Sequence, residues 1–195
     1  MKGIFLFSLL YLSTHVNGQN KLIDFVNPFI GTKNAGHTFP GASVPFGSVQ
    51  LSPDTDTIPL FHNRKYTGDV YRYCDGYQYI DSTIVGFSHT HFSGTGHADL
   101  GDILMMPANG KILLNPGTEQ HPELGYRSTY AHENEFSQPN FYRVKLDESN
   151  INVELTSTER VGMHRYTFSD TTNRHVILDL VHGIYNYNEK KFGLF

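Results

Sequence analysis

Apolar and polar residues alternate with a period of two through much of the second half of this 195-residue sequence. The alternation covers four segments, at 142–146, 151–155, 163–168 and 176–180. Because successive side chains of a β-strand point to opposite faces, this period predicts half-buried strands. Turn-forming residues such as those at 147–150 and 169–173 separate them into strands of about six to eight residues. We therefore expect an all-β, antiparallel β-sandwich rather than a helix bundle.

The first half of the chain is rich in turn formers. The sequence has 18 Gly and 9 Pro, and aromatic residues make up 13% of it. The stretch from Phe25 to Pro53 is dense in Gly and Pro, yet aromatic and apolar residues that a disordered segment would lack recur in it, among them Phe25, Phe29, Phe39, Phe46, Val49 and Leu51. We expect this stretch to be an ordered loop region with short strands that packs against the sandwich.

Charge and cysteine content narrow the function classes. Fifteen Lys and Arg stand against nineteen Asp and Glu, with no basic block, which argues against a nucleic-acid partner. The length suits one domain rather than two. Cys74 is the only cysteine, so no internal disulfide is available and core packing must supply the stability.

The first 18 residues have the pattern of a secretory signal peptide. Lys2 precedes the short apolar run 4–12, and a plausible cleavage site follows at 16–18. The run is shorter than the roughly 20 residues that span a bilayer, so we expect no membrane span. We expect a secreted or periplasmic protein with one domain over 19–195. A retained membrane anchor or a buried helix is the alternative reading of the segment.

The segment 86–102 concentrates chemistry-bearing residues, with three His, two Asp and four Gly. If 85–92 is a strand, His89 and His91 point to one face, as in some metal sites, and His97, Asp99 and Asp102 could complete such a site. A cupin, however, would have a Glu where this chain has Gly94 to Gly96. We assign no metal ligand, and a cupin-like metal enzyme remains a less favoured alternative.

Other motifs suit a polar ligand such as a sugar. Tyrosines alternate with polar residues over 70–79, and a tyrosine ring suits the apolar face of a sugar, although core packing explains such clusters as well. The glycines around Ser93 and Thr95 permit close approach of the backbone to a ligand. Paired carboxylates at 54 and 56, 99 and 102, and 133 and 135 lack an apolar context, so we assign none of them as catalytic.

Read together, the stretches Phe25–Thr32, Gly36–Gly47 and Gly86–Gly96 closely resemble the opening of glycoside hydrolase family 92. The likeness continues through 99–104, 137–142, 155–166 and 177–180, and so covers essentially the whole expected mature chain. The resemblance implies an amino-terminal β-sandwich that packs on a carboxy-terminal (α/α)6 barrel. It also implies an inverting, calcium-dependent exo-α-mannosidase whose active site lies between the two domains.

In this family the general acid, the general base and most of the calcium environment belong to the barrel, which this sequence does not contain. The resemblance therefore implies the amino-terminal part of a secreted α-mannosidase acting on α-mannosides of glycans, inactive alone and with weak or absent calcium binding. Its expected partners are a mannose-containing glycan and the missing barrel, in cis or as a separate chain. A stand-alone carbohydrate-binding module is the alternative.

The resemblance places several residues at the substrate cleft and assigns no catalytic residue to this chain. Relatives often have Trp in the stretch matching Val70 to Tyr77, where this chain has only tyrosines, which would alter specificity. The expected substrate-binding residues are His37, Tyr71, Tyr73, Tyr77, His89, His91, Ser93, Thr95, Asp99 and Asp102.

Overall fold

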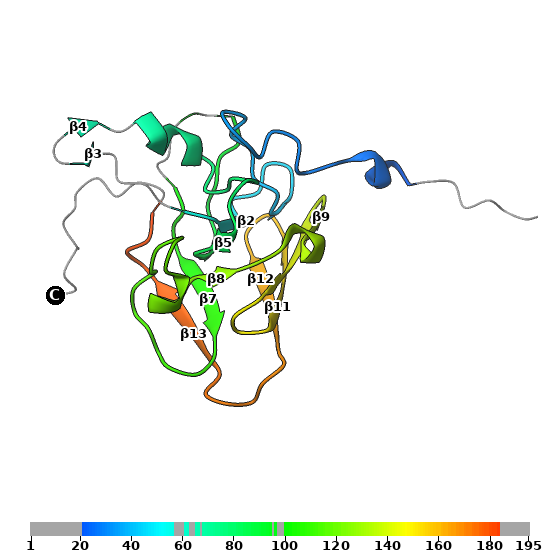
Figure 1. Ribbon diagram of the computed structural model, residues 1–195. Helices are drawn as coiled ribbons and strands as arrows, with labels where there is room; N and C mark the ends of the chain where they lie inside the picture. Colours follow the sequence, from blue (N-terminus) through cyan, green and yellow to red (C-terminus); the bar gives the residue numbers. More distant parts are fainter. Residues whose placement is uncertain are drawn as a thin grey trace, which may run out of the picture.

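The computed structural model describes residues 21–56, 61–62, 65–66, 68–94, 96 and 100–183. Within these residues two antiparallel sheets pack against each other, and short strand pairs and 3₁₀ helices lie around them (Figure 1). The β-sandwich expected from the sequence is thus confirmed. The expected signal peptide lies outside the described residues. No helix in the described part of the chain has the length and apolar character needed to cross a bilayer.

The four-stranded sheet is formed by consecutive hairpins in the order β12-β11-β10-β9. Its strands are β9 (Phe136–Gln138), β10 (Phe141–Leu146), β11 (Ile151–Ser157) and β12 (Gly162–Phe168). The expected strands 142–146, 151–155 and 163–168 are therefore confirmed. Along β11 the buried positions alternate with more exposed ones, as the sequence pattern predicts. Asn150 ends the β10–β11 turn with a φ of 51°, a left-handed conformation that asparagine tolerates well.

The five-stranded sheet has the order β1-β2-β6-β7-β13. Its strands are β1 (Ala42–Ser43), β2 (Gln50–Asp54), β6 (Gly86–Ser88), β7 (Leu104–Ala108) and β13 (His175–Asp179). β13 confirms the expected strand near 176–180, but the side chains face the other way. Val176 and Leu178 are 42% and 55% exposed, and Ile177 between them packs in the core.

The remaining elements are short. They are the strand pair β3 (Phe61–His62) with β4 (Lys65–Tyr66), the pair β5 (Thr83–Ile84) with β8 (Ser128–Thr129), and the 3₁₀ helices η1 (Leu22–Phe25), η2 (Gly68–Tyr73), η3 (Pro122–Leu124) and η4 (His132–Asn134). η1 lies on an arm that extends away from the body of the sandwich (Figure 1). The Gly- and Pro-rich stretch 25–53 contributes only β1 and most of β2 to the sheets.

The core lies between the two sheets. Apolar side chains from both sheets are fully or almost fully buried in it, including Leu51, Phe87 and Leu104 from one and Tyr142, Val153 and Leu155 from the other. Burying each such side chain contributes about 1.5–3 kcal/mol to folding. Cys74 is a buried free thiol, and burial raises its pKa to about 11.

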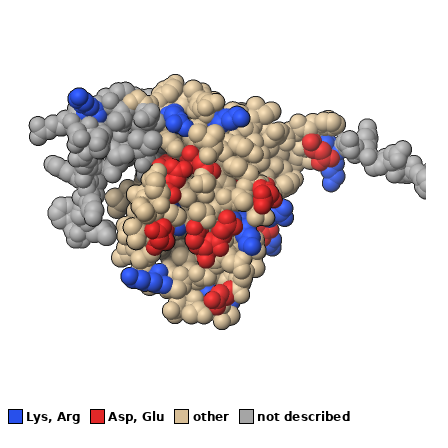
Figure 2. All heavy atoms as spheres, viewed as in Figure 1, with Lys and Arg blue, Asp and Glu red and all other residues tan. Residues whose placement is uncertain are grey.

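Charged side chains are mixed over the surface. On the face shown in Figure 2, acidic side chains gather near the middle of the body, and Lys and Arg lie among and around them. That face therefore presents no basic field of the kind that attracts nucleic acid.

Candidate functional site

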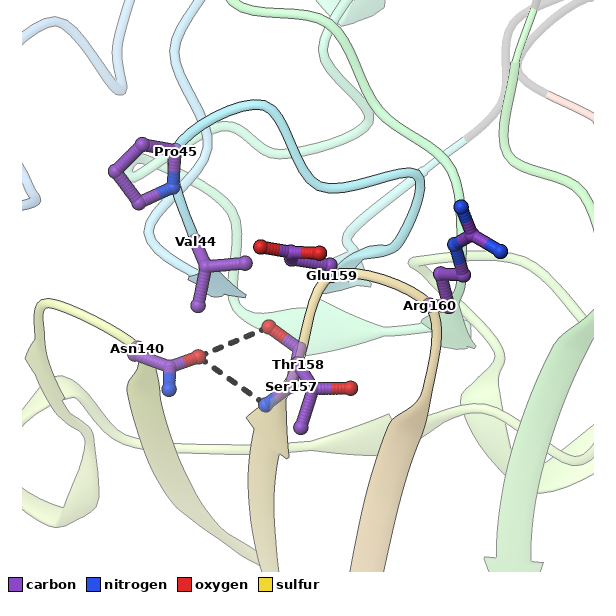
Figure 3. A pocket seen from close by; sticks show the side chains of 7 residues that line it. All are labelled: Val44, Pro45, Asn140, Ser157, Thr158, Glu159 and Arg160. Atoms are coloured by element: carbon purple, nitrogen blue, oxygen red, sulfur yellow. Dashed lines mark hydrogen bonds between the residues drawn. The ribbon is translucent and has the colours of Figure 1, made fainter.

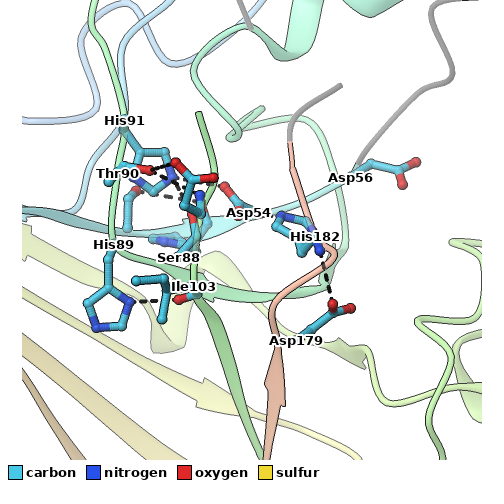
Figure 4. Close-up of polar contacts among 12 residues, drawn as sticks. Asp54, Asp56, Ser88, His89, Thr90, His91, Ile103, Asp179 and His182 are labelled. Atoms are coloured by element: carbon cyan, nitrogen blue, oxygen red, sulfur yellow. Dashed lines mark hydrogen bonds and ion pairs between the residues drawn. The ribbon is translucent and has the colours of Figure 1, made fainter. Parts of the chain in front are cut away.

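A buried group of ionisable side chains surrounds Asp54, the last residue of β2. The Asp54 side chain is completely buried, and its carboxylate accepts hydrogen bonds from two histidines (Figure 4). His91 Nε2 lies 2.9 Å from Oδ1, and His182 Nε2 lies 2.8 Å from Oδ2. Three segments far apart in the sequence therefore meet at one carboxylate.

The hydrogen bonds of His91 define its protonation. Nδ1 lies 2.7 Å from the carbonyl oxygen of Gln50, which only accepts, and Nε2 faces the Asp54 carboxylate. Both nitrogens therefore donate, and His91 and Asp54 form a buried imidazolium–carboxylate pair. Burial alone would raise the pKa of Asp54, but the charge of His91 and the hydrogen bonds from His182 and His91 outweigh it and lower that pKa to about 2.

Asp75 is a second buried carboxyl in the same region, and its environment is the opposite. The side chain is fully buried, and neither oxygen receives a hydrogen bond from another residue in the described part of the chain. Burial raises the pKa of Asp75 to about 8, and the neighbouring Asp54 adds to the shift. Asp75 is therefore uncharged at neutral pH, whereas Asp54 is ionised.

Gly76 allows the two carboxyls to come together. Its φ of +79° lies in the left-handed region, and an added Cβ would stand 2.1 Å from Asp54 Oδ1 and 3.2 Å from His91 Cδ2. Its carbonyl oxygen accepts the amide hydrogen of Thr55 at 2.8 Å. The close approach of this turn to β2 requires a residue without a side chain.

His37 and Tyr71 form the more open part of the candidate site. The His37 ring is almost completely buried, and neither ring nitrogen has a hydrogen-bond partner among the described residues. Burial lowers its pKa, so the imidazole is neutral near pH 7. The edge of Tyr71 packs on it with ring centroids 4.5 Å apart, and Tyr71 itself is 47% exposed. A buried imidazole without a hydrogen-bond partner among the described residues, beside an exposed aromatic ring, marks a candidate binding site for a polar ligand.

Two of the expected sugar-binding tyrosines lie inside the molecule. Tyr73 is 5% exposed and donates its hydroxyl to Asp81, and Tyr77 is fully buried and donates its hydroxyl to Glu135. A ring that is covered on both faces, with its hydroxyl already bonded, has no surface to offer a sugar. In this structure both tyrosines support the loop that carries Tyr71.

The segment around His89 and His91 differs from the strand expected over 85–92. The strand β6 ends at Ser88, and the chain bends at His89 because its amide bonds to the Asp102 carbonyl of the neighbouring loop. The two imidazoles consequently part. His91 turns to Asp54, and His89 donates from Nδ1 to the carbonyl oxygen of Ile103 at 2.7 Å (Figure 4).

Of the remaining expected residues, two are exposed and two lie outside the residues that the structure describes. Ser93 and Asp102 are exposed, and the Asp102 carboxylate accepts a hydrogen bond from Thr90 Oγ1 at 3.1 Å. Thr95 and Asp99 lie outside the described residues, as does His97. Among the residues that the structure describes, no three His, Cys, Asp or Glu side chains are placed to hold one metal ion.

Sequence reasoning missed three residues of the buried cluster around Asp54. Asp54 reads as a turn former, Asp75 stands among tyrosines, and His182 lies 91 positions from its neighbour His91 in the sequence. The meeting of the three depends on tertiary contacts.

A separate open groove of about 640 Å³ lies where the β1–β2 loop meets the β11–β12 loop (Figure 3). At its floor Asn140 Oδ1 accepts hydrogen bonds from the amide and the hydroxyl of Ser157, at 3.2 and 2.9 Å. None of the expected site residues lines it. Its lining residues are Val44, Pro45, Asn140, Ser157, Thr158, Glu159 and Arg160.

The two packed sheets and the buried carboxylate–histidine cluster define an all-β sandwich domain. Residues 25–193 match the model of the glycosyl hydrolase family 92 N-terminal domain, so the chain belongs to this family. The resemblance noted from the sequence is thereby confirmed.

Solved relatives agree with this assignment. The structure of a family 92 alpha-mannosidase from Bacteroides thetaiotaomicron, in complex with mannoimidazole, matches with a TM-score of 0.76 and 43% identity. The match covers 85% of this chain and 20% of that one. A second family 92 glycosyl hydrolase matches with a TM-score of 0.65 and 25% identity over 83% of this chain and 21% of that one.

A curated relative from Arthroderma benhamiae is described as an uncharacterized secreted glycosidase. It is 27% identical over 158 residues, which make up 77% of this chain and 18% of that protein. The chain thus spans about a fifth of the length of the relatives that it matches.

Proposed function

We propose that this chain is the amino-terminal β-sandwich part of a secreted, calcium-dependent, inverting α-mannosidase that acts on α-mannosides of glycans. The proposal is supported by membership of the family and by 43% identity to an alpha-mannosidase over 85% of the chain. The expected signal peptide and a relative described as a secreted glycosidase support the export of the protein. The observation that carries the proposal is the exposed Tyr71 ring beside His37, whose ring nitrogens have no hydrogen-bond partner among the described residues.

In the proposed enzyme the sandwich supplies one wall of the substrate cleft. Tyr71 and Ser93 contact the sugar, together with the expected contacts Thr95, Asp99 and Asp102, and the buried His37 packs behind Tyr71. The buried residues Tyr73, Tyr77 and His91 and the half-buried His89 hold the loops in place, because their polar atoms are already bonded inside the protein.

The chain alone does not hydrolyse mannosides in this proposal. Inverting hydrolysis uses two carboxyl groups about 6.5–9.5 Å apart on either side of the glycosidic bond. Asp54 and Asp75 are fully buried and so cannot reach a sugar. As the family resemblance implies, we assign the acid and the base to an (α/α)6 barrel, joined in cis or supplied as a separate chain.

The described residues do not fit a calcium site. Calcium takes six to eight oxygen ligands, whereas no suitable group of three side chains exists among the described residues. We assign calcium binding to the barrel, and no catalytic step on this chain involves it.

The test begins with the locus beyond the codon for Phe195, read for an in-frame barrel. The enzyme with its barrel should hydrolyse an aryl α-mannoside, and the 195-residue chain should not. In the complete enzyme, His37→Ala and Tyr71→Ala should lower kcat/KM at least tenfold, whereas His121→Ala, at an exposed site, should not. Turnover by the isolated chain, or full activity of both cleft variants, would contradict the proposal.

A stand-alone carbohydrate-binding module is the second candidate. It is favoured by the exposure of Tyr71 beside His37, whose ring has no hydrogen-bond partner in the described part of the chain. Such a module would bind mannobiose without hydrolysing it. Calorimetric titration of mannobiose into the isolated chain distinguishes the two candidates, because the half-cleft of an enzyme should give no measurable heat.

A further inference from the structure

Two histidines connect the sheets of the sandwich at a point outside the Asp54 cluster. His164 lies on β12 of the four-stranded sheet, and His89 directly follows β6 of the five-stranded sheet. Their Nε2 atoms are 3.3 Å apart, and their ring centroids are 4.9 Å apart.

The partners of these rings define a directed chain of hydrogen bonds. The carbonyl of Ile103 only accepts, so His89 Nδ1 carries a hydrogen, and Nε2 of a neutral His89 offers a lone pair. His164 Nε2 donates to that lone pair. The Tyr166 hydroxyl, 2.7 Å from His164 Nδ1, donates to the remaining lone pair. Every polar atom of the two rings is satisfied while both are neutral. One added proton is also accommodated, if His89 donates from both nitrogens and His164 Nδ1 donates to the Tyr166 hydroxyl oxygen, whereas a second proton is not.

The surroundings offer no counter-charge for an added proton. The groups that face the pair are the Tyr166 hydroxyl from β12, the Ile103 carbonyl from the loop before β7, and the Asp102 carbonyl, which accepts the His89 amide. No carboxylate among the described residues bonds to either ring, and the Asp102 side chain is engaged by Thr90. Burial and the neighbouring His89 lower the pKa of His164 to about 4.

The loop before β7, whose Ile103 carbonyl accepts the hydrogen bond from His89, has a strained backbone. Ile103 has a φ of 58°, which is unfavourable for a β-branched residue, and it is 47% exposed. Strained conformations of this kind persist only where neighbouring contacts hold them. The hydrogen bond from His89 to the Ile103 carbonyl is such a contact.

We propose that His164 is a positioning residue that acts through His89, and that the pair forms an acid-sensitive clamp on the candidate-site loop 89–93 and on Ile103. A second proton turns the shared Nε2–H···Nε2 bond into two opposed N–H groups. The rings then separate, the His89–Ile103 bond is lost, and the loop relaxes. The His91–Asp54 pair, which is already charged, remains. The clamp requires no mannosidase activity, so it stands or falls separately from the proposed function.

The test uses NMR of the isotopically labelled 195-residue chain between pH 8 and pH 4. His164 should titrate with a pKa near 4, well below the ordinary range of a histidine. The amides of Thr90 and Ile103 should shift at that same midpoint. Amide exchange of Ile103, corrected for its intrinsic rate, should increase at least tenfold between pH 7 and pH 4.

Variants separate the clamp from a general acid effect. In His164→Gln the pH-dependent shift of Thr90 and Ile103 should disappear, and in His121→Gln it should be unchanged. A loop that stays fixed while His164 titrates, or a shift that persists in His164→Gln, would overturn the proposal. If His164→Gln does not fold, the titration of the unaltered chain decides alone.

Discussion

Asp54 and Asp75 are both completely buried, yet their pKa values are displaced in opposite directions. Two histidines donate to Asp54, and no other described residue donates to Asp75. One carboxyl is therefore ionised and the other neutral at the same pH, which gives the two groups opposite effects on the pH dependence of stability.

Asp54→Asn should lower the free energy of unfolding by about 3 kcal/mol or more at pH 7, because it leaves His91 without its counter-charge. The folded-state pKa of Asp54 is depressed, so its contribution is present above the unfolded pKa near 3.8 and is lost as the pH falls toward about 2. Urea unfolding at pH 7 and pH 3 measures both effects. Glu123→Gln, at an exposed site, is the control, and an equal loss in both variants would refute the role of Asp54.

The sequence predicts the strands better than the site. β10 and β11 are predicted well because one face of each strand is buried, and this produces a period-two pattern in residues such as Val144 and Val153. The orientation of β13 was missed because both of its faces carry apolar residues, and only packing shows that Ile177 is the buried one.

For the candidate site, local sequence identified the His89–His91 segment but not its partners. A separation of two residues suggested one shared face, but the strand ends at Ser88 and the rings go to Ile103 and Asp54. The partners of His91 lie 37 and 41 positions away in the sequence, and no local pattern encodes such a meeting.

Asp75→Asn should stabilise the protein at alkaline pH. The folded-state pKa of Asp75 is raised to about 8, so between pH 4 and pH 8 the folded state holds a proton that the unfolded state releases. Stability attributable to this group therefore falls as the pH rises through that window. The amide does not ionise, so the variant should exceed the unaltered chain by at least about 1 kcal/mol at pH 8. Equal stabilities of the two proteins across pH 5–8 would show that the Asp75 carboxylate has a counter-charge.

Phe46→Gly should raise the free energy of unfolding by about 0.5–1 kcal/mol, the relief of left-handed strain less the entropy cost of glycine. Phe46 has a φ of 61°, and its side chain is fully exposed, so little packing is lost. Leu114→Gly is the matched control, since Leu114 is 81% exposed without a positive φ. The control should lose about 0.5–1 kcal/mol. Thermal or urea unfolding should therefore show a gain in stability for Phe46→Gly and a loss for Leu114→Gly. A loss in both variants would mean that the Phe46 ring packs against the protein.

Gly76→Ala should destabilise the protein far more than Gly110→Ala, although both glycines have nearly the same left-handed φ, +79° and +76°. A Cβ at Gly110 meets nothing within 4 Å, so that variant isolates the conformational cost of about 1–2 kcal/mol. At Gly76 the Cβ would also press on Asp54 Oδ1 and displace it from His91. The Gly76 variant should therefore lose an additional 2 kcal/mol or so, in line with the cost of breaking a buried pair. Urea unfolding of the two variants measures the difference, and equal losses would mean that the turn at Gly76 does not pack against the Asp54–His91 pair.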